Sequence, residues 1–125
     1  MPPRSPGAPL GFPPGAPRPR VHGVNRTRDE WLALAHAGAS RLCSHGARRV
    51  WLFGSLARGR RLDARSDLDF AVEGLPPDRY LAALGDLLTS LPCDVDLVEL
   101  ERAPAPLRLN IERARILLAD ENQPL

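Results

Sequence analysis

Lysine is absent from this sequence of 125 residues, and all 17 of its positively charged side chains are arginines. No lysine can therefore serve as a catalytic amine or as a clamp on a phosphate group. Cysteine is nearly absent too, since Cys43 and Cys93 form neither a CxxC pair nor a zinc-ligand spacing. This pattern argues against a disulfide framework and favours a reducing, cytoplasmic setting.

Long apolar runs are also missing, so nothing in the sequence predicts a membrane span or the apolar core of a signal peptide. We therefore expect no membrane partner. The net charge is +2, but residues 1–20 contain three arginines and no acidic residue. From Val21 onward, 14 arginines stand against 15 acidic residues, so we expect no direct nucleic-acid binding.

Proline is concentrated in the first 20 residues, which hold eight of the 14 prolines. Proline has no backbone N–H, and this stretch offers few side chains that could fill a core. We predict a disordered tail over residues 1–22, rich in proline, glycine and arginine. Residues 23–125 are then long enough for one modest domain.

The remaining sequence alternates helical and strand patterns. A capping box of Thr27 and Glu30 starts the first helix, and Gly46 can close it. The helix after two prolines is expected to bury Tyr80, Leu81, Leu84, Leu87 and Leu88. The predicted order is helix 27–45, strand 48–53, short helical turn 55–59, strand 67–73, helix 76–89, strand 94–100, helix 103–113 and strand 116–119. This order indicates an α/β or α+β fold, a small mixed sheet with helices packed on it.

Two aspartates stand at the start of the strand predicted over residues 67–73. Alternate residues of a strand share a face, so Asp67 and Asp69 point the same way while Leu68 points into the core. Such carboxylates repel each other unless a cation lies between them, and Mg²⁺ prefers oxygen ligands. Asp96 offers a third carboxylate from a later strand. If the two strands are neighbours, the three aspartates converge as two-metal phosphoryl transfer requires.

A Gly-Ser pair follows the strand predicted over residues 48–53. Gly54 lets a phosphate approach the backbone, and the Ser55 hydroxyl adds a donor. Arg58, one helical turn on, can direct its guanidinium toward the same phosphates. By contrast, His36 and His45 have no metal-ligand partner at helical spacing, so we expect them to be surface or capping residues.

Each of these motifs is common by itself, but their order and spacing resemble a known family. GSLARG and SDLDF, followed by CDVDLVEL, are similar to the minimal nucleotidyltransferases of the DNA polymerase β superfamily. Within that superfamily the pattern is most similar to the antitoxin partners of HEPN-domain toxins. The resemblance covers residues 28–120. It implies a polymerase β-like fold and transfer of AMP from ATP to a hydroxyl, namely a tyrosine of the cognate toxin.

The resemblance also implies residue roles. Gly54 and Ser55 would hold the triphosphate with help from Arg58. Asp67 and Asp69 would bind Mg²⁺, and Asp96 would complete the metal site and help to activate the attacking hydroxyl.

One feature departs from the family pattern: the spacer over residues 56–66 is one residue longer than usual, within the arginine-rich loop 60–65.

Two alternatives to this function remain open. In the first, the chain would be a non-catalytic antitoxin that neutralises its partner by binding. In the second, it would be a transferase that acts on a small molecule or an RNA end.

Overall fold

The computed structural model describes residues 26–60 and 66–121 and contains one four-stranded sheet with the order β3-β2-β1-β4. Strand β1 pairs antiparallel with β2 and β4, whereas β2 and β3 run parallel. The elements are α1 (Arg28–Ser44), β1 (Arg49–Phe53), α2 (Gly54–Ala57), β2 (Leu68–Glu73), η2 (Pro77–Arg79), α3 (Tyr80–Ser90), β3 (Val95–Glu99), η3 (Leu100–Arg102), α4 (Ala105–Arg113) and β4 (Ile116–Asp120). The predicted α+β class and mixed sheet are confirmed.

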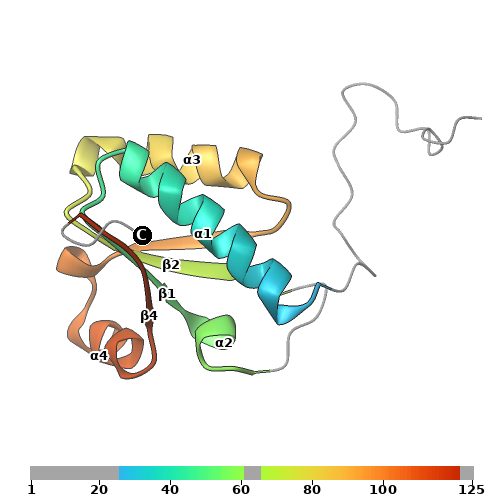
Figure 1. Ribbon diagram of the computed structural model, residues 1–125. Coiled ribbons are helices and arrows are strands. Elements are labelled where there is room, and N and C mark those ends of the chain that lie inside the picture. Colours follow the sequence, from blue (N-terminus) through green and yellow to red (C-terminus); the bar gives the residue numbers. More distant parts are fainter. Residues whose placement is uncertain (1–25, 61–65, 122–125) are drawn as a thin grey trace, which may run out of the picture.

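The two faces of the sheet are covered unequally. Helices α1 and α3 lie side by side on one face, and α4 lies on the other (Figure 1). The larger core forms beneath α1 and α3 and includes Trp31, Leu52 and Phe70. On the α4 side, a smaller cluster consists of Ala71, Leu100 and Ile111, with Trp51 packed against it. The described residues thus cover one face of the sheet densely and the other only partly.

Helix α1 begins and ends as the sequence predicts. The Thr27 hydroxyl accepts from the Glu30 amide at 3.1 Å, and the Glu30 carboxylate accepts from the Thr27 amide at 2.7 Å. Gly46 follows the helix with a φ of 109°, a conformation that favours glycine. His45 is the C-cap residue and bonds to Asp86 of α3 at 3.0 Å, which confirms its expected capping role.

The buried side of α3 differs from the prediction. Leu87 is buried and Leu84 is partly buried, but Leu81 is 78% exposed and Leu88 is 48% exposed. The helix starts at Tyr80, so the side that faces the sheet repeats at three- and four-residue intervals from there. Leu81 and Leu88 lie two helical turns apart on a different stripe, which faces away from the core.

The remaining differences lie at the edges of elements. The second sheet strand begins at Leu68 rather than Asp67, and the predicted helix over 103–113 begins at Ala105 after the short η3 turn. Residues 1–22, and residues 61–65 of the longer spacer, lie outside the described residues, so the disordered tail stays a prediction. Within the described ranges, none of the helices has the length and apolar character needed to cross a membrane.

Two helical glycines provide a matched test of core packing. A Cβ at Gly38 would lie 2.6 Å from Cζ of Phe70, whose ring is fully buried, whereas a Cβ at Gly85 would meet nothing within 4 Å. We expect Gly38→Ala to lower the free energy of unfolding by about 1–2 kcal/mol, because overpacking outweighs the gain in helix propensity. Gly85→Ala should raise it by about 0.5–1 kcal/mol.

Urea unfolding of the two variants beside the unchanged protein measures both effects. Stabilisation by Gly38→Ala would contradict the close packing of α1 on β2.

Candidate functional site

The parallel pairing of β2 with β3 places two carboxylates side by side. Asp69 is the register partner of Asp96, and their neighbours Phe70 and Leu97 are partners in the next row. Phe70 and Leu97 are buried in the larger core, so the two aspartates project from the opposite face. The predicted neighbour relation between the two acidic strands is therefore present.

Asp69 sits in an environment that disfavours its charge. Burial, and after it repulsion by Asp96 and by Asp67, together raise the pKa of Asp69 from 3.8 to about 6. Asp67 itself is exposed and immediately precedes β2. Both other predicted carboxylates thus act electrostatically on Asp69, and each added negative charge makes the site more favourable for a cation.

Gly54 packs directly against this carboxylate. Phe53 is the register partner of Asp69 at the end of β1, so the following residue turns across the start of β2. Gly54 has a φ of 80°, and a Cβ at this position would overlap Oδ2 of Asp69. Only glycine combines this backbone conformation with so close an approach, so the sequence motif has a structural cause.

The short helix α2 is tied to elements on both sides. Arg28 of α1 donates to the Leu56 carbonyl at 2.8 Å, and the Arg58 amide donates to the Gly54 carbonyl at 3.0 Å. The Arg58 guanidinium donates to Oδ1 of Asn110 in α4 at 2.6 Å. Ser55 is partly buried within α2. Sequence reasoning missed Asn110, because nothing in the sequence connects two residues 52 positions apart.

The donor set fits a hard divalent cation. Carboxylate oxygens are the protein ligands that Mg²⁺ prefers, and a cation would relieve the repulsion that raises the pKa of Asp69. Over residues 26–60 and 66–121, no three His, Cys, Asp or Glu side chains already converge as a metal site. An ion held by Asp67, Asp69 and Asp96 together would therefore draw these side chains toward one another.

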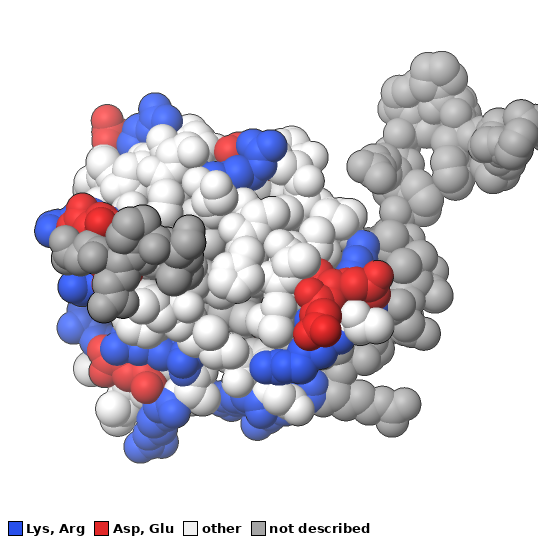
Figure 2. Space-filling model, viewed as in Figure 1, with Lys and Arg blue, Asp and Glu red and all other residues white. Residues whose placement is uncertain are grey.

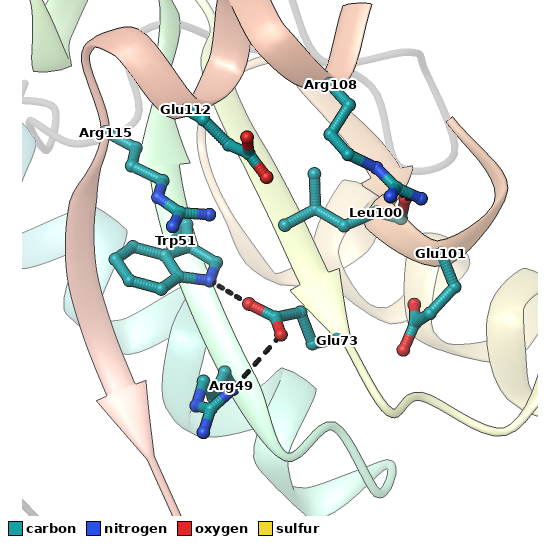
Figure 3. Close-up of a pocket in the computed structure, with 8 residues that line it drawn as sticks. All are labelled: Arg49, Trp51, Glu73, Leu100, Glu101, Arg108, Glu112 and Arg115. Atoms are coloured by element: carbon teal, nitrogen blue, oxygen red, sulfur yellow. Dashed lines mark hydrogen bonds and ion pairs between the residues drawn. The ribbon is translucent and has the colours of Figure 1, made fainter. Parts of the chain in front are cut away.

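A hollow of about 250 Å³ lies on the same sheet face at the far end of the strands (Figure 3). On its floor, Glu73 accepts hydrogen bonds from the Trp51 indole at 2.6 Å and from Arg49 at 3.2 Å. Arg49 also donates to Asp120 at 3.1 Å, and the Arg115 guanidinium lies 3.8 Å from the centre of a Trp51 ring. These contacts join β1, β2 and β4, so we assign the cluster a structural role.

Replacing Asp69 provides a test of the carboxylate environment. Between pH 3.8 and about 6 the native state binds more protons at Asp69 than the unfolded state does, so ionisation of Asp69 lowers stability as the pH rises. In metal-free buffer at about pH 7.5, we expect Asp69→Asn to raise the Tm by about 4–8 °C. Near about pH 4.5 the gain should shrink, because Asp69 is then largely protonated in the native protein.

Thermal unfolding followed by circular dichroism measures this difference at the two pH values. The control is Asp78→Asn on η2, an exposed carboxylate, which should shift the Tm by no more than about 1 °C. An equal gain for Asp69→Asn at both pH values would contradict the assigned environment.

Comparison with known proteins gives a consistent set of relatives. The family model described as polymerase beta, nucleotidyltransferase, matches residues 43–124. The structure of a candidate minimal nucleotidyltransferase is 30% identical, with a TM-score of 0.62, and the match covers 75% of this chain and 98% of that chain. No curated protein sequence gives a significant match.

Two more distant structures share the fold. A candidate nucleotidyltransferase from Sulfolobus solfataricus is 16% identical, with a TM-score of 0.55 over 78% of this chain and 87% of that chain. A chain of a toxin–antitoxin crystal structure with AMP-PNP is 23% identical, with a TM-score of 0.52 over 76% of this chain and 74% of that chain. The family match spans all four strands of the sheet and the carboxylate row, and the chain therefore belongs to the polymerase beta nucleotidyltransferase family.

Proposed function

We propose that the protein is a Mg²⁺-dependent nucleotidyltransferase that transfers AMP from ATP to a hydroxyl acceptor. The observation that carries the proposal is the row formed by Gly54, Asp69 and Asp96. In this row a glycine turn packs against one carboxylate, and a second carboxylate lies in register beside it. A glycine turn next to paired carboxylates suits a metal-bound triphosphate.

Each predicted residue has a role that its position permits. Asp67 and Asp69 would hold Mg²⁺, which when bound neutralises charge on the triphosphate. Gly54 would let the phosphates approach the backbone of the turn, with Ser55 and Arg58 as side-chain donors.

Asp96 would complete the metal site and help to remove the proton of the attacking hydroxyl. As the oxygen–phosphorus bond forms at the α-phosphate, the bond to pyrophosphate breaks and pyrophosphate leaves. Catalysis then depends on positioning and charge neutralisation, with no covalent intermediate on the protein.

For the acceptor, we propose a tyrosine of a cognate HEPN-domain toxin, so that the protein acts as an antitoxin. The sequence resemblance to antitoxin partners of such toxins supports this assignment. A relative with the same fold was crystallised in a toxin–antitoxin complex with AMP-PNP, which adds support for both a toxin partner and an adenine nucleotide. Tyr80 of this chain is not an acceptor in this scheme, because its hydroxyl donates to the Leu97 carbonyl at 2.7 Å.

Transfer is tested with labelled ATP, Mg²⁺ and the product of the neighbouring gene. We expect label on that partner, and a loss of about 100-fold or more in rate for Asp67→Asn, Asp69→Asn or Asp96→Asn. Asp78→Asn should transfer label normally, because η2 follows the opposite end of β2 from the aspartates. Labelling that persists in all three site variants would place the chemistry elsewhere.

Neutralisation of the partner separates catalysis from binding alone. In cells that express the partner, the double variant Asp67→Asn/Asp69→Asn should fail to restore growth, because the modification is lost. Co-purification should still recover the complex, since both substitutions preserve side-chain shape. Full neutralisation by the double variant would instead favour the non-catalytic antitoxin.

A further inference from the structure

We propose that Asn110 is a positioning residue that holds Arg58 ready for the outer phosphates of the nucleotide. This inference rests on the proposed function and adds a residue from α4 to a site otherwise built from α2, β2 and β3. The contact is a single short hydrogen bond, 2.6 Å from the Arg58 guanidinium to Oδ1 of Asn110.

Asn110 occupies a fixed place on the aspartate face. Its neighbour Ile111 is buried in the small cluster with Ala71, which is two residues along β2 from Asp69. Arg108, two residues before Asn110, anchors α4 through two hydrogen bonds to the Leu100 carbonyl, at 2.7 Å and 3.1 Å. The acceptor for Arg58 therefore projects from a helix whose position is set by packing.

The main chain of Arg58 is fixed as well. Its amide bonds to the Gly54 carbonyl, so the residue is anchored to the turn that packs on Asp69. Only the long side chain remains free to move, and an arginine side chain loses considerable rotamer freedom when it is ordered. The bond to Asn110 restricts this freedom before any nucleotide arrives, which lowers the ordering cost of binding.

The chemistry of the acceptor is suited to this role. An amide oxygen accepts a hydrogen bond from one N–H of the guanidinium and does not neutralise the positive charge of the arginine. Further N–H donors of the guanidinium remain available to phosphate oxygens. Arg41, Arg48 and Arg49 are instead paired with carboxylates. Among the described residues, Arg58 has no such carboxylate partner. Arginine side chains also gather along the side of the molecule where α2 and α4 lie (Figure 2).

The bond is exposed to solvent, so it contributes little to folding and its variants should fold normally. A purely structural bond would also tolerate Asn110→Asp, because a carboxylate is a stronger acceptor for arginine. A positioning role predicts the opposite for nucleotide binding. The carboxylate would compete with the phosphates for the guanidinium and repel them.

The experiment is calorimetric titration of the full chain with AMP-PNP and, separately, with AMP, both in Mg²⁺. We expect Arg58→Ala to weaken AMP-PNP binding about tenfold. Asn110→Ala should weaken it about three- to tenfold, and Asn110→Asp at least as much. The double variant Arg58→Ala/Asn110→Ala should bind no more weakly than Arg58→Ala alone. Binding of AMP should change less than about twofold throughout, because AMP lacks the outer phosphates.

Leu109→Ala is the matched control, an exposed residue of the same helix that should bind AMP-PNP normally. Three results would overturn the inference. Asn110→Ala could bind AMP-PNP as the unchanged protein does, it could weaken AMP-PNP binding equally with and without Arg58→Ala, or it could weaken the binding of AMP and AMP-PNP equally. If the unchanged protein does not bind AMP-PNP at all, the proposed function fails together with this inference. If it binds AMP-PNP but gives one of these three results, only this inference fails.

Discussion

The parallel pairing of β2 with β3 is the constraint on which the site depends. Side chains alternate along each strand, so Leu68 and Phe70 can enter the core only if Asp69 projects from the other face. A slip of one residue in the strand register would exchange the apolar and the acidic side chains between the two faces and bury carboxylates beneath α1 and α3. The hydrophobic effect thus keeps Asp69 beside Asp96, even though the two carboxylates repel each other.

This arrangement lowers the stability of the fold locally. Burial and like charges raise the pKa of Asp69 to about 6, so at neutral pH the fold carries an unfavourable ionised group. Gly54 adds to the crowding, since its backbone lies against the same carboxylate. Strongly perturbed acids of this kind are concentrated at functional sites, where a ligand compensates for the cost. A metal-bound triphosphate would supply that compensation.

Most of the fold could be predicted from the sequence because local signals agreed with the tertiary structure. The capping box at Thr27 and the apolar strand through Leu52 each define one element without reference to the rest of the chain. The exposure of Leu81 could not be predicted, because the phase of α3 depends on where the helix meets the sheet. The bond from Arg58 to Asn110 could not be predicted either, since it depends on how α4 packs through Ile111 against β2 and η3.

The unequal covering of the sheet explains how so short a chain can support a site. Beneath α1 and α3, the larger core supplies most of the buried apolar surface and fixes the strands. On the other face, the described residues form a buried cluster of only Ala71, Leu100 and Ile111 between the sheet and α4, and within residues 26–60 and 66–121 Asp69 stays partly exposed and Asp96 exposed. A second dense layer would increase stability but would exclude the nucleotide and the protein acceptor that we propose. The face beneath α1 and α3 therefore provides most of the stability, and the other face carries the candidate site. Helix α4 contributes to both, because Ile111 packs on the sheet while Asn110 bonds to Arg58.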